Sequence, residues 1–344
     1  MCKDILRIAV VGCGAVTERR HLPALVRRDD CEVVALVDQN EARAKQLASS
    51  MGGAPKIFTN YRDLLALDIA AAIVALPNHL HAPVSIDLLK AGIHLLVEKP
   101  MALSVAECDA MVEAAESGKA VLAVGLPRRF LHAARFAKWA IRNGVLGQII
   151  SFDIRDGYVF DWPLASDFFF RKETAGGGVL IDTGAHTLDQ VLWWLGDVDS
   201  FEYYDDSFGG VESECELHMV LKSGVQGIVE LSRTRNLRNT AIIRGDQAEL
   251  EVGLIKNTLT LTLAGGPWQV VGQAALPHGP ASTQQSQVDL IAAEHDDFLQ
   301  SIRTGRPPEV AGSEARRCID WIQACYRQRR SLGLPWTTAL SEAV

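Results

Sequence analysis

The first 125 residues alternate short apolar runs with longer amphipathic segments. The apolar runs predict strands at Leu6–Val11, Glu32–Val37, Ala70–Leu76, Ile93–Val97 and Val121–Val124. The intervening segments predict helices at Val16–Arg28, Asn40–Met51, His79–Ala91 and Ser104–Ser117. Strands that are apolar on both faces and alternate with helices of this length are typical of βαβ units. We therefore expect residues 1–126 to form a doubly wound parallel sheet.

After Pro127 the pattern changes to polar–apolar alternation. A helix is predicted at Phe130–Arg142, and strands are predicted at Ile149–Ile154, Cys215–Leu221, Gly227–Ser232, Thr240–Arg244, Ala248–Val252 and Leu259–Leu263. Turn signals such as Lys222-Ser223-Gly224 join several of them, which favours an open, mostly antiparallel sheet. Helices predicted at Val288–Arg303 and Ser313–Arg330 follow. The expected fold class is α/β, with a second α+β domain at residues 127–344.

Length and composition narrow the class of protein. A chain of 344 residues with 48% apolar and 22% charged residues can bury two cores. The net charge of −8, without a long basic block, gives no electrostatic reason to bind nucleic acid or an anionic membrane. The early apolar stretch Ile5–Val11 is too short for a membrane span or a usual signal peptide. We expect a cytoplasmic protein.

The seven cysteines are scattered, odd in number and without a C-x-x-C pair. This spacing argues against a disulfide framework and against a zinc site. We expect reduced thiols and no metal.

The tripeptide Glu98-Lys99-Pro100 closes the apolar run Ile93–Val97. In open α/β sheets, ligands bind at the carboxyl ends of the strands, which is where Lys99 would lie. An ammonium group there can polarise a hydroxyl or a carbonyl. Pro100 restricts Lys99 to extended backbone geometry and stops the strand from continuing.

Gly12-Cys13-Gly14-Ala15-Val16-Thr17 follows the first predicted strand and opens the first predicted helix. In this context a glycine pair lets the backbone approach a pyrophosphate, which then lies at the helix N-terminus. Gly12, Gly14, Ala15 and Val16 are therefore candidate cofactor-binding residues. Thr17 replaces the third glycine of the usual fingerprint, so a purely structural turn is the alternative.

Asp38 ends the second predicted strand, where a carboxylate can accept hydrogen bonds from an adenosine ribose. A carboxylate would repel a 2′-phosphate, which favours NAD over NADP. Arg43, one turn into the next helix, leaves NADP open. The alternative is that Asp38 only caps that helix.

The segment Leu76-Pro77-Asn78-His79-Leu80-His81 follows another predicted strand. We expect Pro77 and Asn78 to contribute to the nicotinamide side of the same site. His79 and His81 are candidate ligands or acid–base groups, and a structural role at the start of a helix is an equal alternative.

The second half contains Gly176-Gly177-Gly178 followed closely by Asp182 and His186. Consecutive glycines let the backbone pass close to a large group. Asp182 and His186 are four residues apart and would share one face of a helix, where the carboxylate could orient the imidazole for proton transfer. The alternative is a capping aspartate and a surface histidine. Residues suited to shaping a substrate site precede the glycines, namely Tyr158, Asp161 and Trp162.

Assembled in this order, the motifs resemble the glucose–fructose oxidoreductase/inositol dehydrogenase family, also called the Gfo/Idh/MocA oxidoreductases. The resemblance covers nearly the whole chain and includes His21-Leu22-Pro23 and Gly305-Arg306-Pro307-Pro308. It implies an NAD(P)-binding Rossmann domain at residues 1–126. It also implies a substrate-binding and oligomerisation domain at residues 127–344, whose open sheet forms dimers or tetramers.

In similar enzymes the lysine of Glu-Lys-Pro works beside the nicotinamide, the peptide before the proline is commonly cis, and an Asp-x-x-x-His pair completes the acid–base apparatus. The resemblance thus implies catalytic roles for Lys99, Asp182 and His186. We expect hydride transfer between NAD and a secondary alcohol of a sugar, cyclitol or sugar derivative, with NADP not excluded. An NAD-retaining glycosidase and a non-catalytic NAD- or sugar-binding protein are the alternatives. Family resemblance does not name the substrate.

Overall fold

A computed structural model of the protein describes residues 5–163, 167–265, 269–273 and 285–333. Contacts divide the chain into two compact units. The first contains Met1–Pro127, Pro163–Phe168 and Ser286–Ile319, and the second contains Arg128–Trp162, Phe169–Gln285 and Asp320–Val344. The first boundary falls one residue beyond the one expected at 126. Residues 286–319, which we expected in the second domain, instead pack within the first unit.

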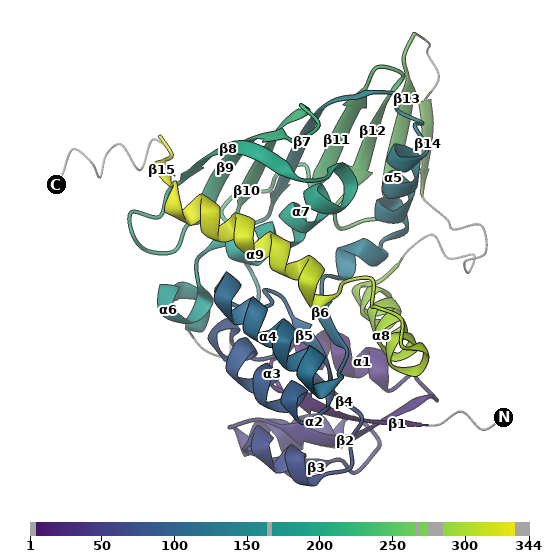
Figure 1. Ribbon diagram of the computed structural model, residues 1–344, viewed down its shortest axis with the longest axis vertical. Helices are drawn as coiled ribbons and strands as arrows, with labels where there is room; N and C mark the ends of the chain where they lie inside the picture. The colour runs from purple at the N-terminus through teal and green to yellow at the C-terminus, as the bar shows by residue number, and fades with distance from the viewer. Residues whose placement is uncertain (1–4, 164–166, 266–268, 274–284, 334–344) are drawn as a thin grey trace. The chain divides into compact units, whose positions relative to one another are not determined.

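The first unit is built on a six-stranded parallel sheet in the order β3-β2-β1-β4-β5-β6 (Figure 1). This is the strand order of a Rossmann fold and confirms the predicted parallel sheet. The strands are β1 (Leu6–Val11), β2 (Cys31–Val37), β3 (Lys56–Phe58), β4 (Ala71–Val74), β5 (His94–Glu98) and β6 (Leu122–Gly125).

Helices cover this sheet. They are η1 (Thr17–His21), α1 (Leu22–Leu25), α2 (Glu41–Ser49), η2 (Tyr61–Ala66), η3 (Asn78–Leu80), α3 (His81–Lys90), α4 (Val105–Gly118) and α8 (Gln287–Thr304). Phe298 and Leu299 of α8 belong to the same apolar core as Ile8 and Val10 of β1. Burial of this apolar surface explains why a helix late in the sequence belongs to the first unit.

The second unit is built on a nine-stranded sheet in the order β14-β13-β12-β11-β7-β10-β9-β8-β15. Neighbouring strands are antiparallel except for the pairs β10–β7 and β15–β8, so the predicted mostly antiparallel sheet is confirmed. The strands are β7 (Ile149–Gly157), β8 (Val198–Asp205), β9 (Glu214–Leu221), β10 (Gln226–Ser232), β11 (Thr240–Gly245), β12 (Ala248–Gly253), β13 (Thr258–Leu263), β14 (Gln269–Gln273) and β15 (Arg330–Ser331).

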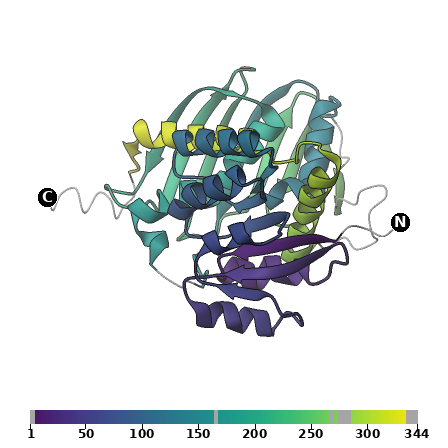
Figure 2. The same ribbon diagram turned by 60° about the horizontal axis from the view of Figure 1, so that its bottom comes forward.

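Helices lie along one face of this second sheet (Figure 2). They are α5 (His132–Arg142), α7 (Val179–Leu195) and the end of α9 (Gly312–Arg327), with the short segments η4 (Pro127–Phe130), η5 (Phe168–Phe170) and α6 (Lys172–Ala175) nearby in sequence. Phe152 and Ile154 of β7 are buried, whereas Asp153 and Arg155, which alternate with them, are partly exposed. One sheet face therefore carries the core and the other carries polar side chains.

The structure differs from the sequence expectations in a few places. The helix expected at Val16–Arg28 contains a π-helical turn, η1, before α1. The short strand β3 and the strand β8 were not predicted. In β8 the partly exposed Phe201 packs against Trp321 of α9, which blurs the simple alternation used to find strands.

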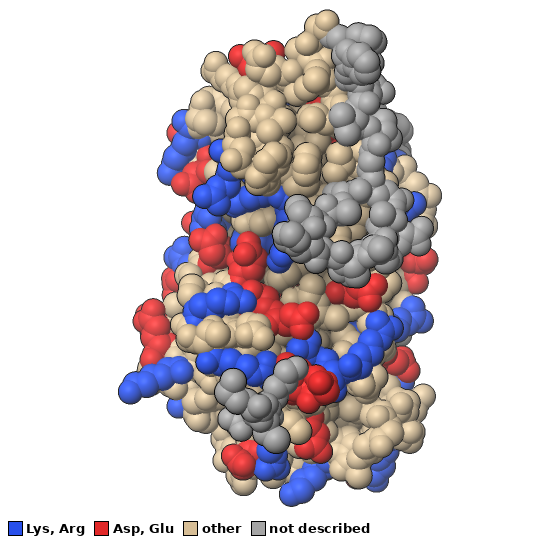
Figure 3. Space-filling model, turned by 90° about the vertical axis from the view of Figure 1, so that its right-hand side faces the viewer, with Lys and Arg blue, Asp and Glu red and all other residues tan. Residues whose placement is uncertain are grey.

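The described residues show a mixed surface charge and buried thiols. On the face drawn in Figure 3, basic and acidic side chains are interspersed rather than segregated. Six cysteines are described, and each is buried and outside any disulfide. None of the helices within the described ranges is long and apolar enough to cross a membrane.

Candidate functional site

The loop after β1 passes close to the neighbouring strand. Gly12 has φ +100°, and a Cβ added there would lie 2.1 Å from the carbonyl oxygen of Ala75, so only glycine fits. A Cβ added at Gly14 would meet nothing within 4 Å. The amide of Glu18 donates to the Gly14 carbonyl at 3.0 Å, so the helix begins directly from this open loop. Open space beside a helix N-terminus fits a pyrophosphate.

Thr17, in place of the usual third glycine, is fully buried. Its hydroxyl donates to the Gly12 carbonyl oxygen at 2.6 Å, and the π-helical turn begins at this residue. The hydroxyl therefore holds the loop and the helix together. Threonine at this position is compatible with the phosphate-binding geometry.

Asp38 lies at the end of β2, beside the same loop. Its Oδ2 accepts from the Cys13 amide and its Oδ1 from the Asn40 amide, each at 2.8 Å. The cap of α2 is Asn40, whose side chain accepts from the Arg43 amide. The capping alternative for Asp38 is therefore wrong in this structure. Each carboxylate oxygen keeps a further lone pair for a ribose hydroxyl.

Arg43 also reaches this loop. Its Nε donates to the Cys13 carbonyl at 2.9 Å, and its Nη2 lies 2.7 Å from a carboxylate oxygen of Glu18. The positive charge next to Asp38 is thus already paired. Sequence reasoning found Arg43 but not Glu18, because a glutamate in the first turn of a helix carries no signal of its own.

The segment after β4 contains Pro77 and the starts of η3 and α3, Asn78 and His81. Asn78 and His81 are buried. The two ring nitrogens of His81 lie 2.8 Å from the Leu76 carbonyl oxygen and 2.7 Å from the Pro100 carbonyl oxygen. The imidazole thus faces the backbone of two strand-end loops, and burial lowers its pKa.

Glu98 ends β5, and the peptide between Lys99 and Pro100 is cis. The carboxylate of Glu98 is engaged on both oxygens: Oε2 accepts from the Lys99 amide at 3.1 Å, and Oε1 lies 2.9 Å from Nε2 of His21. Burial raises the pKa of Glu98, but the hydrogen bond from His21 and the charge of Lys99 outweigh it, so the pKa lies below its usual value. Glu98 is held as a carboxylate beneath Lys99.

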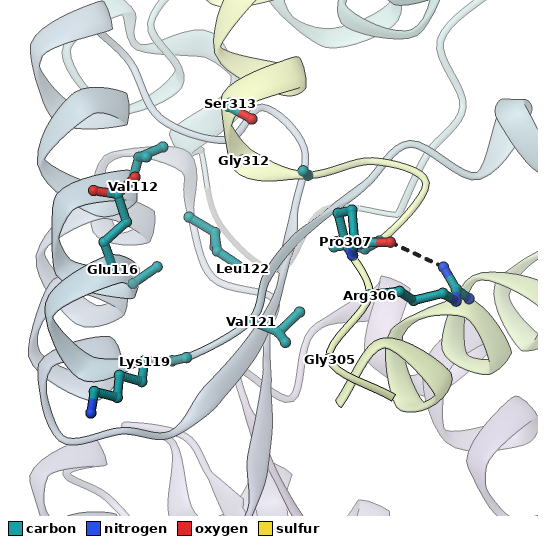
Figure 4. A pocket seen from close by; sticks show the side chains of 14 residues that line it. Val112, Glu116, Lys119, Val121, Leu122, Gly305, Arg306, Pro307, Gly312 and Ser313 are labelled. Carbon is teal, nitrogen blue, oxygen red and sulfur yellow. Dashed lines mark hydrogen bonds between the residues drawn. The ribbon is translucent and has the colours of Figure 1, made fainter. Parts of the chain in front are cut away.

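All first-unit candidates follow the carboxyl ends of parallel strands: the glycine loop after β1, Asp38 after β2, Pro77 after β4 and Lys99 after β5. A separate cavity of about 360 Å³ lies between α4 and residues 305–313 (Figure 4). It is lined by Val121 and Leu122, where β6 begins. Because the strands are parallel, this cavity belongs to the opposite edge of the sheet from Lys99.

Helix α7 of the second unit is buried on nearly all sides. Over its first three turns, only Asp182 and His186 are partly exposed, and Trp193, seven residues beyond His186, continues the same face. The predicted helical spacing of Asp182 and His186 is therefore confirmed. The apolar remainder of the helix anchors this face.

Arg233 is a site residue that sequence reasoning missed. Its Nη2 lies 2.9 Å from Oδ2 of Asp182 and 3.2 Å from the Gly178 carbonyl oxygen, and its guanidinium carbon lies 5.4 Å from the centre of the Phe160 ring. Asp182 is thus paired with a buried arginine. A basic residue directly after β10 is the signal that could have found it.

The glycine triplet has an internal explanation. A Cβ at Gly177 would lie 1.9 Å from the Tyr326 hydroxyl, and one at Gly178 would lie 1.8 Å from the Glu212 carbonyl oxygen. The Glu212 carboxylate accepts from the Gly178 and Leu180 amides, each at 2.9 Å. Gly177 and Gly178 therefore let α7 begin against Tyr326 and Glu212, so the large group that the backbone approaches here belongs to the chain itself.

Two further ion pairs involve the segment before α5, one with Asp189 of α7 and one with Asp156 of β7. Arg129 makes a bidentate pair with Asp189 at 2.6 and 2.8 Å, and Arg128 lies 2.5 Å from Asp156. Both pairs lie inside the second unit and are buried or nearly so, which gives Arg128 and Arg129 structural roles.

The predicted substrate-shaping residues lie after β7 in the second unit. The Tyr158 amide donates to the Ser232 carbonyl at 3.2 Å, which places this residue beside the end of β10. Trp162 is partly exposed and Asp161 is exposed. The 158–162 segment therefore lies next to the strand end that is followed by Arg233.

Comparisons with known proteins identify both parts of the chain. Residues 6–126 match the family model described as "Oxidoreductase family, NAD-binding Rossmann fold", and residues 138–334 match "Oxidoreductase family, C-terminal alpha/beta domain". Levoglucosan dehydrogenase in complex with NADH and L-sorbose has a similar fold, with a TM-score of 0.84 and 21% identity over 94% of this chain and 96% of that chain.

Two relatives of the chain are also oxidoreductases by name. The D-glucoside 3-dehydrogenase of Escherichia coli K12 is 33% identical over 57% of this chain, and the chain spans 56% of that relative's length. The myo-inositol 2-dehydrogenase of Thermotoga maritima is 23% identical over 98% of this chain and 100% of that protein. With both family models matched in chain order, the chain belongs to the Gfo/Idh/MocA oxidoreductase family.

Proposed function

We propose that this protein is an NAD-dependent oxidoreductase that transfers a hydride between the nicotinamide and a secondary alcohol carbon of a sugar, cyclitol or sugar derivative. The observation that carries the proposal is the strand-end cluster of the first unit, where an open glycine loop and Asp38 occur together with Lys99. A dinucleotide site equipped with an ammonium group suits redox chemistry at a hydroxyl better than simple binding.

The relatives support the substrate class. They include dehydrogenases named for a glucoside, for myo-inositol, for levoglucosan and for glucose 6-phosphate. Each of the compounds in these names carries secondary hydroxyl groups, and these groups are chemically alike. We assign the class from this shared chemistry and leave the individual sugar to experiment.

The residues of the first unit fit NAD. The open loop at Gly12 and Gly14 would hold the pyrophosphate, and Asp38 would accept hydrogen bonds from the adenosine ribose. When bound, the cofactor supplies the hydride acceptor at the nicotinamide. Asp38 and the pairing of Arg43 with Glu18 favour a ribose without a 2′-phosphate.

Side chains of the protein would accept the hydroxyl proton and stabilise the negative charge that develops on the substrate oxygen. As hydride leaves the carbinol carbon, the hydroxyl must lose a proton, and His186 would accept it. The ammonium of Lys99 would stabilise the developing alkoxide. Asp182 would form an ion pair with Arg233 and so fix the side of α7 that carries His186. Its 2.9 Å ion pair with Arg233 favours this role over a proton relay between the Asp182 carboxylate and the His186 imidazole.

We also propose that the protein is a cytoplasmic homo-oligomer, with the polar face of the nine-stranded sheet as its interface. The six described cysteines are buried and form no disulfide, which supports a reducing compartment. The interface proposal is supported by partly exposed side chains on neighbouring central strands, among them Glu216, His218, Ile228 and Ile242. Sedimentation analysis of wild type and an Ile228→Lys variant tests it, since a monomeric wild type would refute it.

The activity is tested by NAD reduction across a panel of sugars, methyl glycosides and cyclitols, using wild type and Lys99→Met. Because acid–base and charge-stabilising groups typically contribute about 10²- to 10⁴-fold, the variant should lose most turnover. Its NAD affinity should stay near that of wild type. Wild-type turnover by Lys99→Met on the best substrate would refute the role of Lys99. Release of an aglycone without net NADH would favour an NAD-retaining glycosidase instead.

A further inference from the structure

Three buried histidines surround the Glu98-Lys99-Pro100 segment, and the mechanism above uses none of them. His21, His81 and His295 are each at most 1% exposed and come from η1, α3 and α8 of the first unit. Burying a polar ring is costly unless its nitrogens are hydrogen-bonded. The contacts of these rings therefore indicate what they are fixed against.

His21 holds the carboxylate that holds Lys99. Its Nε2 lies 2.9 Å from Oε1 of Glu98, and a carboxylate only accepts, so Nε2 carries the proton. The other oxygen of Glu98 accepts from the Lys99 amide at 3.1 Å. On the side of β6 the backbone is close, because a Cβ at Gly125 would lie 3.3 Å from the Glu98 carboxyl group. Glu98 therefore has little room to move.

His295 completes the chain of hydrogen bonds. Its Nε2 lies 3.0 Å from Nδ1 of His21, and the two rings are stacked with centres 5.2 Å apart. In a neutral His21 whose proton is on Nε2, Nδ1 accepts, so Nε2 of His295 must donate. The nearby carboxyl group of Glu294 has a pKa raised by burial, which leaves Glu98 as the charged member of the cluster.

His81 fixes the segment from the other side. Its Nδ1 lies 2.7 Å from the Pro100 carbonyl oxygen, and its Nε2 lies 2.8 Å from the Leu76 carbonyl oxygen. Because burial lowers the pKa of His81, the ring is neutral and has one N–H, so it donates to only one of these two carbonyl oxygens. We assign that N–H to Nδ1, whose contact with the Pro100 carbonyl oxygen is the shorter of the two, so that a hydrogen bond holds the backbone on each side of Lys99.

We propose that His21, His295 and His81 are positioning residues for Lys99, forming a buried imidazole clamp that holds its backbone in one place. The inference rests on the proposed function, because it assigns the clamp an effect on turnover through Lys99. Fixing the Cα of Lys99 limits where its ammonium group can lie. A displacement of about 1 Å in such a group costs about 100-fold in rate.

The first test compares His21→Leu with His21→Gln, each made in wild type and in Lys99→Met. Glutamine can place its side-chain amide nitrogen near the position of Nε2 and still donate to Glu98, whereas leucine cannot. In wild type, His21→Leu should lower kcat about 10- to 100-fold with little change in the KM for NAD, and His21→Gln should recover most of the loss. In Lys99→Met, His21→Leu should cause no further loss.

Equal losses in both backgrounds, or a glutamine variant as damaged as the leucine variant, would overturn the clamp. The matching pair His295→Gln and His295→Leu gives the same comparison at the next hydrogen bond along the chain of contacts that leads to Lys99. The test therefore stands even if His21→Leu does not fold. If Lys99→Met itself is fully active, the proposed function fails. If Lys99→Met is inactive while both leucine variants turn over normally, only the clamp fails.

A second readout needs no substrate. Nitrogen-15 NMR of histidine-labelled wild-type protein at neutral pH should show His21 and His295 as neutral rings, each protonated on Nε2. In His295→Leu, the Nδ1 resonance of His21 should shift because that nitrogen loses its donor. A His21 protonated on Nδ1 alone, or an unchanged Nδ1 resonance in His295→Leu, would contradict the assigned hydrogen-bond chain.

Discussion

Nη2 of Arg233 lies 2.9 Å from Oδ2 of Asp182, and both side chains are largely buried. Asp182 therefore faces a permanent positive charge at the start of α7, four residues before His186. The arginine is 51 residues away in sequence, and this contact changes the role expected for the carboxylate.

Replacing Arg233 should damage the acid–base face of α7. In Arg233→Met, Asp182 keeps its charge but loses this ion pair, and breaking a buried pair in this way costs about 3–5 kcal/mol of stability. The pH profile of kcat/KM should also move, because the charges near His186 change. Arg233→Lys should retain much of the stability. Identical pH profiles for wild type and Arg233→Met, measured on a folded variant, would contradict this account.

The cofactor preference should depend on Asp38 and Glu18 together. The Asp38 carboxylate would repel a 2′-phosphate. The Glu18 carboxylate accepts from Nη2 of Arg43 at 2.7 Å, so this guanidinium is already paired. We expect Asp38→Ser to strengthen NADP binding and Asp38→Ser/Glu18→Gln to strengthen it further, by about tenfold, since hydrogen bonds to charged groups are worth about 1.5–3 kcal/mol.

Calorimetric Kd values for NAD and NADP measure this effect without any sugar substrate. Adding Arg43→Gln to the double variant is the control and should remove the second gain. If the gain from Glu18→Gln persists without Arg43, the pairing is not the cause.

Glu212 should be essential to the stability of α7. Its carboxyl group accepts from two amides at the helix start and from the Tyr326 hydroxyl, which donates at 2.8 Å. Glu212→Ala would leave these buried donors unpaired at about 1–3 kcal/mol each. Tyr326→Phe removes one contact and should cost about 1 kcal/mol. Urea unfolding of the two variants measures the difference, and an equal loss in both would contradict the capping role of Glu212.

The stability of the protein should depend on pH through His295. Burial lowers the pKa of His295 well below its usual value, and the positive charge of Arg28 lowers it further. The folded state therefore keeps this ring neutral, while the unfolded chain binds a proton below about pH 6.5. The stability that His295 contributes is fully present above about pH 6.5 and is lost as the pH falls through and below it, by about 1.4 kcal/mol per pH unit.

His295→Gln cannot bind that proton in either state. Urea unfolding of wild type and variant between about pH 7.5 and pH 5.5 should therefore show a shallower loss of stability in the variant. The comparison concerns the slope, so a uniformly less stable variant still gives an answer. Parallel slopes would show that His295 titrates alike in both states.

Much of the fold followed from local patterns. Apolar runs located five of the six strands of the first unit to within two residues at each end, and the helix predicted from Ser104 does begin there, with a capping box formed by Ser104 and Glu107. Glycines and polar residues at strand ends marked Gly12, Asp38 and Lys99, because strand-end position can be deduced from sequence. The strand β3 was missed because it is only three residues long and partly exposed.

The remaining site features depend on contacts between distant residues. Arg233 binds Asp182 across 51 positions, and His295 binds His21 across 274 positions. Neither Arg233 nor His295 lies in one of the predicted motifs, so periodicity and spacing carry no signal for them. The glycine triplet differs from these cases, because its pattern was clear in the sequence. The group that Gly178 packs against, Glu212, could not be predicted, because the contact is between residues distant in sequence.

The central claim is that this chain moves a hydride from a sugar or cyclitol carbon to the nicotinamide. The most direct measurement is to incubate wild-type protein and NAD with C-deuterated glucose, methyl glucoside and myo-inositol, and to analyse the reduced cofactor by NMR. The account predicts that at least one substrate yields NADH carrying deuterium at nicotinamide C4, and that Lys99→Met yields far less. Tight NAD binding with no deuterated cofactor from any of the three, or NADH that contains no deuterium, would contradict it.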